Sequence, residues 1–176
     1  MAGIDESIQF VAVQIAILTV SDTRGEEEDR SGATLVDRAA RAGHKIVQRA
    51  IVPDERGQIE HKLREWIADP QIDVIISTGG TGVTGRDVTP EAFRAVYDKE
   101  IEGFGELFRF ISLKHIGAST IQSRATGVVA KGTYLFALPG SPGACKDAWD
   151  EILVHQLDRR YRPCNFVELM PRLMEK

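Results

Sequence analysis

The sequence has few of the residues that mark disulfide-rich, metal-binding, nucleic-acid-binding or membrane proteins. Its two cysteines, Cys145 and Cys164, are too few and too isolated for a disulfide framework or a zinc site. The four histidines are scattered singly, without ligand spacing. Basic residues are outnumbered, and a net charge of −4 argues against nucleic-acid binding. Long apolar runs and a signal-peptide pattern are lacking, so we expect a cytoplasmic protein that binds neither nucleic acid nor membrane.

The composition that remains is that of an ordinary globular domain. The chain has 176 residues, 43% of them hydrophobic and 27% charged, which suits one well-buried domain and is short for two. We expect an N-terminal arm over residues 1–10, which would reach a neighbouring subunit. An α/β domain would follow over residues 11–158, and residues 159–176 would form a tail packing on it.

Apolar runs alternate with helical patterns along the domain. Residues 11–20 and 74–76 are nearly continuous in apolar residues, as expected for strands that are buried on both faces, and residues 45–52 are predicted to form a further strand. Amphipathic segments follow each run, the first with Ser31 as a candidate N-cap. Lys131-Gly132 predicts a hairpin turn between two later strands. The pattern predicts a three-layer αβα sandwich, with a mainly parallel sheet, helices on both faces and a β-hairpin edge.

A glycine-rich loop follows the third strand. Gly79, Gly80, Gly82 and Gly85 remove side chains from four of seven positions, so the backbone can adopt positive φ and its N–H groups can converge on an anion. A helix should begin beyond the loop, with Thr89 as N-cap and Pro90 at its first position. Because Asp87 would repel a phosphate unless a cation lay between them, the loop predicts a site for a magnesium-bound phosphate compound.

Three other interpretations of this loop are possible from the sequence. Residues 80–85 match the dinucleotide pattern G-x-G-x-x-G, but that motif belongs to a first strand–turn–helix unit, and here the helix signal comes four residues later. Residues 80–87 approach the P-loop, yet Arg86 and Asp87 replace its lysine and hydroxyl residue. A glycine-rich connection without a ligand is the third interpretation.

Other polar segments should join this loop. In a mainly parallel sheet, ligands bind beyond the carboxyl ends of the strands. Four segments are expected there: Ser21-Asp22, Pro53-Asp54, residues 78–87 and residues 139–141. In the last of them, Ser141 and Pro142 repeat the arrangement of a cap followed by a first-turn proline. The candidate site should therefore be assembled from several loops.

These segments carry a family resemblance. In order, the matching motifs are Thr-Val-Ser-Asp, Val-Pro-Asp, Thr-Gly-Gly-Thr-Gly, Arg-Asp-Val-Thr-Pro-Glu-Ala, Gly-Phe-Gly-Glu, Gln-Ser-Arg-Ala and Leu-Pro-Gly-Ser-Pro. They resemble the molybdenum cofactor biosynthesis proteins of the MoaB/MogA group, over residues 15–166. Each motif is weak alone, whereas the ordered set is specific.

The resemblance implies a molybdopterin-binding fold that forms trimers or hexamers. It also implies Mg²⁺-dependent adenylylation of molybdopterin by ATP, with release of pyrophosphate, and a downstream protein that inserts the metal. Asp54 and Asp87 match the acidic residues required for this reaction and would hold Mg²⁺. Nucleotide or pterin contacts are expected from Ser21, Asp22, Thr78, Gly79, Gly80, Thr81, Gly82, Ser123, Arg124, Pro139, Gly140 and Ser141.

Alternatives to this enzyme remain open at the level of the sequence. Asp54 could only shape the turn after Pro53, and Asp87 could only pair with Arg86. The protein could then be a non-catalytic molybdopterin-binding scaffold of the same pathway. A nicotinamide-dependent dehydrogenase, read from the literal glycine pattern, is a third hypothesis.

Overall fold

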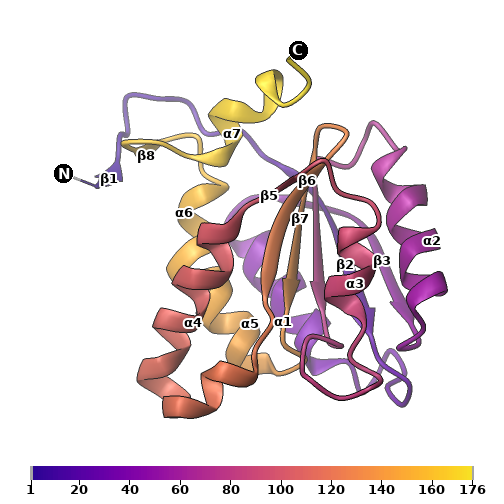
Figure 1. Cartoon of the computed structure of the whole chain (residues 1–176). Helices are drawn as coiled ribbons and strands as arrows, with labels where there is room; N and C mark the ends of the chain where they lie inside the picture. Colours follow the sequence, from indigo (N-terminus) through magenta and orange to yellow (C-terminus); the bar gives the residue numbers. More distant parts are fainter. Residues whose placement is uncertain (1, 176) are drawn as a thin grey trace.

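The main sheet of the protein has six strands between two layers of helices (Figure 1). The computed structural model describes residues 2–175. The strands, in spatial order, are β3 (Lys45–Val52), β2 (Gln14–Val20), β4 (Val74–Thr78), β7 (Thr133–Leu138), β6 (Thr126–Ala130) and β5 (Lys99–Glu100). The first four pair in parallel, whereas β6 and β5 are antiparallel additions. The predicted three-layer α/β architecture is confirmed.

Successive side chains on the central strands pack alternately into two separate hydrophobic cores. Ile15 and Ile17 of β2 belong to one hydrophobic cluster, and Ala16 and Leu18 belong to the other. Successive side chains point to opposite faces of a strand, so a strand covered on both faces must be apolar throughout. All four side chains are fully buried.

The helices divide between the two faces of the sheet. One face is covered by α1 (Arg30–Arg41), α4 (Glu102–Ile116) and α5 (Pro142–Ala148), which pack on one another. The other face is covered by α2 (Arg56–Ile67) and α3 (Thr89–Arg94) (Figure 1).

Two helix starts differ from those predicted. Helix α1 is capped by Asp29, whose Oδ1 accepts the Gly32 N–H at 2.8 Å, and Ser31 lies inside the helix. Asp29 also accepts hydrogen bonds from Thr19 and Arg49, so a carboxylate in a charged stretch is buried with its partners. In α3, Thr89 is the first helical residue rather than the cap.

The start of one strand and one edge of the sheet also differ from the prediction. Strand β2 begins at Gln14, and residues 11–13 precede it. The predicted hairpin forms between β6 and β7, but its outer strand is not the last one, because β5 pairs with β6 through Lys99 and Glu100.

The two ends of the chain pair with each other. Strand β1 (Gly3–Ile4) runs antiparallel to β8 (Tyr161–Arg162), far from the glycine loop in Figure 1. Phe166 then packs against Tyr134 and Phe136, so the C-terminal segment does lie on the domain. The expected contact of residues 1–10 with another subunit stays a prediction, and residue 1 lies outside the described residues.

Candidate functional site

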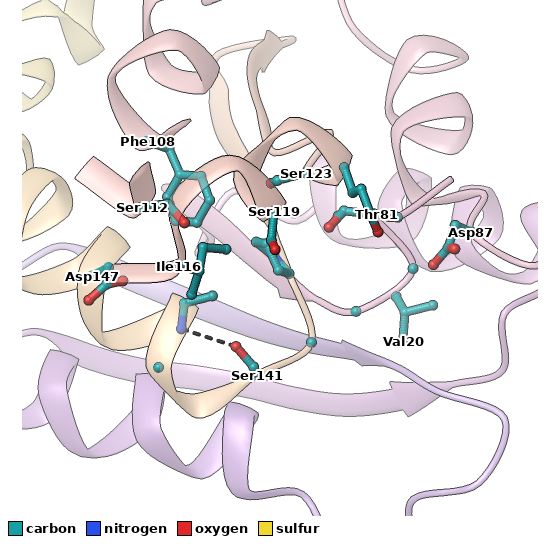
Figure 2. Close-up of a pocket in the computed structure, with 18 of the residues that line it drawn as sticks. Val20, Thr81, Asp87, Phe108, Ser112, Ile116, Ser119, Ser123, Ser141 and Asp147 are labelled. Atoms are coloured by element: carbon teal, nitrogen blue, oxygen red, sulfur yellow. Dashed lines mark hydrogen bonds between the residues drawn. The ribbon is translucent and has the colours of Figure 1, made fainter. Parts of the chain in front are cut away.

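A cavity of about 630 Å³ opens at the carboxyl ends of β2, β4 and β7 (Figure 2). Its polar side is formed by loops, and most of the residues predicted from the sequence lie there: Ser21, Asp54, Gly79, Gly80, Thr81, Gly82, Asp87, Ser123, Pro139, Gly140 and Ser141. Segments that are up to 120 positions apart in the chain therefore meet at one edge of the sheet, as the parallel topology predicts.

The first two glycines of the loop are required by its backbone. Gly79 and Gly80 have φ of +107° and +63°. A Cβ on Gly79 would lie 2.1 Å from the Val20 carbonyl oxygen, and one on Gly80 would lie 2.4 Å from Thr89 Oγ1. The Thr89 hydroxyl donates to the Gly79 carbonyl at 2.9 Å, and its N–H donates to the Gly80 carbonyl at 3.0 Å. The start of α3 thus holds the first half of the loop in place.

Arg124 holds the second half of the loop from behind. Its guanidinium donates to the carbonyls of Gly82 and Asp87 and pairs with Glu91, while its backbone N–H donates to the Thr81 carbonyl. The side chain does not line the cavity. Arg124 therefore positions the loop. Its side chain is not placed for the direct pterin contact that was expected from the sequence.

Thr78 and Asp22 also lie outside the cavity lining. The buried Thr78 hydroxyl donates to the Pro139 carbonyl at 3.0 Å and so joins the loops after β4 and β7. Asp22 accepts two hydrogen bonds from Arg86, and its Oδ1 also accepts the backbone N–H of Asp54 at 3.0 Å. Both side chains therefore join neighbouring loops of the site.

Asp54 and Asp87 both reach the cavity, in different electrostatic environments. Burial, and next the negative charge of Asp22, raise the pKa of the Asp54 carboxyl above its ordinary value. Burial acts in the same direction on Asp87, but hydrogen bonds from the Thr84 hydroxyl and N–H outweigh it and lower its pKa. Arg86 bonds Asp22 and Glu55. It therefore does not neutralise Asp87, as the alternative interpretation of the sequence required.

The wall opposite the glycine loop was missed by sequence analysis. It comes from α4, from the 3₁₀ helix η1 (Gly117–Gln122) and from the first turns of α5. Its lining residues, some of which are labelled in Figure 2, are Phe108, Ser112, His115, Ile116, Ser119, Gln122, Gly143, Ala144 and Asp147. Arg24 joins the cavity beside Gly140, whose carbonyl accepts from its guanidinium at 3.1 Å. Ser112, a polar residue on the otherwise apolar buried side of α4, was the available signal.

Known proteins resemble this chain over most of its length. A family model described as "Probable molybdopterin binding domain" matches residues 16–159. The chain is 51% identical over 160 residues to molybdenum cofactor biosynthesis protein B of Escherichia coli strain K12, covering 91% of this chain and 94% of that protein. It is 40% identical over 146 residues to the protein of that name from Bacillus subtilis strain 168, covering 82% and 86%.

Solved structures show the same relationship. A crystal structure of molybdenum cofactor biosynthesis protein B superposes with a TM-score of 0.84 at 38% identity, covering 94% of this chain and 98% of the other. The tungsten cofactor synthesizing protein MoaB of Pyrococcus furiosus gives a TM-score of 0.74 at 36% identity, covering 81% and 91%. The predicted resemblance is confirmed, and the chain belongs to the molybdopterin-binding domain family of the MoaB/MogA group.

Proposed function

We propose that this protein acts in molybdenum cofactor biosynthesis by adenylylating molybdopterin with Mg²⁺-ATP. Family membership supports the pathway and the pterin substrate. The observation that carries the transferase proposal is the meeting of Asp54 and Asp87 with the glycine loop in one cavity. Two acidic side chains beside an anion-binding backbone fit a cation and phosphates together better than either alone.

The residues present fit a magnesium ion. The raised pKa of Asp54 reflects burial and nearby negative charge, which a backbone hydrogen bond from Asp22 and the charge of Arg86 only partly offset, and a cation would relieve both. Across residues 2–175, no cluster of three or more His, Cys, Asp or Glu side chains is placed to hold a metal. Mg²⁺ commonly uses one or two carboxylates, with water and substrate phosphates completing its shell. Asp54 and Asp87 would hold it, and it would neutralise phosphate charge.

The proposed reaction transfers AMP. An oxygen of the terminal phosphate of molybdopterin forms a bond to the α-phosphorus of ATP. The bond from that phosphorus to the bridging oxygen breaks, and pyrophosphate leaves with the electron pair. The N–H groups of the loop around Gly80 and Thr81 would orient the phosphates, and Arg24 would add positive charge. Ser21, Ser123 and the Pro139–Ser141 segment supply further polar contacts from the cavity lining.

The test follows α-labelled ATP into a pterin product. Asp54→Asn and Asp87→Asn should each reduce transfer by at least about a hundredfold, within the range for the loss of a group that stabilises transition-state charge. Both variants should still bind molybdopterin. Asp37→Asn, which alters an exposed aspartate on α1, is the matched control and should transfer normally. If the wild type binds molybdopterin but transfers no AMP, the protein is a molybdopterin carrier and the enzyme proposal is wrong.

The surface of α4 supports a homo-oligomer as a second part of this proposal. Leu107, Phe110 and Leu113 of α4 are 45–60% exposed, and Ile121 of η1 is 82% exposed. Large apolar side chains that gather on an exposed surface mark a site that a partner normally covers. We expect light scattering to give a trimer or hexamer, and a stable monomer at micromolar concentration would contradict this. A downstream protein that receives the product for metal insertion is part of the same proposal.

Within residues 2–175, no helix combines the length and apolar character of a membrane span.

A further inference from the structure

The wall of the cavity opposite the glycine loop carries one acidic side chain, Asp147. It lies far from Asp87 in Figure 2, with Ser141 and Thr81 between them. Asp147 is on α5, and its side chain is 21% exposed. The cavity therefore has carboxylates on two sides, and Asp87 belongs to the loop that follows β4 whereas Asp147 is on α5.

The surroundings of Asp147 differ from those of the other two aspartates. The His115 ring is close to it, with Nε2 3.9 Å from Asp147 Oδ1. Within residues 2–175, no hydrogen bond of the structure ends on the Asp147 carboxylate. Asp87, in contrast, accepts two from Thr84. A partly buried carboxylate with free acceptor positions that faces a cavity favours a ligand with N–H donors.

The walls next to Asp147 suit a flat ring. The apolar residues that line this side are Ala144, the exposed Ile116 and the fully buried Phe108, and Ser112 lies between the last two along α4. Planar heterocycles bind between apolar side chains, while a few polar groups fix their orientation. The end of the cavity at Asp147 thus has the chemistry of a base or pterin pocket rather than of a phosphate pocket.

We propose that Asp147 selects the pterin ring by accepting hydrogen bonds from its 2-amino-4-oxopyrimidine edge. This edge presents a ring N–H and an amino group side by side, and a carboxylate can accept from both at once. Adenine presents an amino group beside an unprotonated ring nitrogen, which would repel the second carboxylate oxygen. The inference rests on the proposed function, because it assigns the two ends of the same cavity to the pterin ring and to the phosphates.

The first test measures molybdopterin and ATP affinities of wild type and Asp147→Asn. The variant should bind molybdopterin at least about tenfold more weakly, as expected when a charge-assisted hydrogen bond is lost. Its ATP affinity should not change. Glu151→Gln is the matched control, because it removes the same charge one turn along the helix from an exposed residue outside the cavity lining. Weakened ATP binding with unchanged molybdopterin binding would assign this end to adenine and overturn the inference.

The second test separates direct recognition from a structural effect. 6-Hydroxymethylpterin and 6-hydroxymethyllumazine differ at ring position 2, where lumazine carries an oxo group, and each can be titrated against bound molybdopterin. Wild type should prefer the pterin. Asp147→Asn should prefer the lumazine, because an amide offers an acceptor to the ring N–H and a donor to the oxo group. An unchanged preference in the variant, or no preference in a wild type that binds molybdopterin and transfers AMP, overturns this inference alone. A wild type that binds no molybdopterin overturns the proposed function with it.

Discussion

The guanidinium of Arg124 donates from Nε to the backbone carbonyl of Gly82 at 2.6 Å. A second nitrogen donates to the carbonyl of Asp87, so one planar group spans both sides of the turn that carries this aspartate. The third partner is Glu91 on α3. Such a fork fits several acceptors at fixed angles, which an ammonium group cannot do.

Arg124→Lys should therefore reduce AMP transfer more than it reduces molybdopterin binding. The lysine keeps the charge beside Glu91, but it loses the paired carbonyl contacts that position Asp87. We expect kcat to fall about 10- to 100-fold, since small misplacements of reacting groups cost that much. Arg94→Lys is the control, because Arg94 contacts Glu91 from the exposed side at 3.4 Å. Equal kcat values in the two variants would show that Arg124 does not position Asp87 for the reaction.

Asp54→Asn should raise the unfolding temperature in the absence of Mg²⁺. Burial and the charge of Asp22 raise the pKa of the Asp54 carboxyl. Between about 3.9, its value in an unfolded chain, and the higher native pKa, the native state binds more protons than the unfolded state. Stability falls as pH rises through this window. At pH 7 the ionised carboxylate is thus destabilising, and the amide should relieve the cost.

Mg²⁺ gives the complementary measurement for Asp54. The ion should raise the unfolding temperature of the wild type by mass action and leave that of Asp54→Asn nearly unchanged. Glu55→Gln alters an exposed neighbour that pairs with Arg86, and it should retain the Mg²⁺ response. An Asp54→Asn protein that responds to Mg²⁺ as strongly as the wild type would show that this carboxylate does not hold the ion.

The sequence predicted the strands and the loop side of the cavity because each has a local signature. Burial on both faces leaves a continuous apolar run, and β4 was placed to within two residues for that reason. The edge strand β3 was placed as closely, although Val52 is its only buried residue. Asp29 was missed as a cap because it stands in a charged run that looks solvated. Its burial depends on Thr19 and Arg49, which are distant in the sequence.

For the α4 wall of the cavity the sequence offered one weak signal, the polar Ser112 on the buried side of the helix. Which side of this helix faces the glycine loop depends on its packing against α5 and the sheet, and that is a tertiary property. Asp147 illustrates the limit, because a carboxylate on an amphipathic helix normally faces solvent. Only the position of α5 beside β7 turns it toward the cavity. Binding sites between elements therefore need the structure, even where every element is predicted correctly.

His44 should make the fold sensitive to mild acid. The ring is 6% exposed, and its Nδ1 accepts the Val13 N–H at 3.2 Å, so the neutral form is required. Burial lowers its pKa, and the charge of Asp158 only partly opposes this. Because the native pKa lies below the unfolded value of about 6.5, stability is fully present above that pH. It is lost as pH falls through the native pKa.

Thermal unfolding between pH 7.5 and 5 tests this role of His44. His44→Asn keeps an acceptor for Val13 but cannot be protonated in this range. It also loses ring contacts with Phe10 and Trp149. Its unfolding temperature should be lower at pH 7.5 and should decline less than that of the wild type toward pH 5. Parallel curves for the two proteins would mean that another group controls the acid response.

In the glycine loop, the same substitution should have different effects on stability at two positions, because a Cβ meets close neighbours at Gly80 and open space at Gly85. Gly80→Ala puts a Cβ 2.4 Å from Thr89 Oγ1 and 2.9 Å from Asp54 Oδ1, at a φ of +63°. Strain and displaced contacts should cost about 2–4 kcal/mol of unfolding free energy. Gly85→Ala meets nothing within 4 Å, so its effect should stay within about 0.5 kcal/mol. Urea unfolding measures both. In a dinucleotide fingerprint the last glycine, here Gly85, is needed for close packing of helix on strand. A Gly85→Ala variant as unstable as Gly80→Ala would therefore favour that interpretation of the loop, and a tolerated one would count against it.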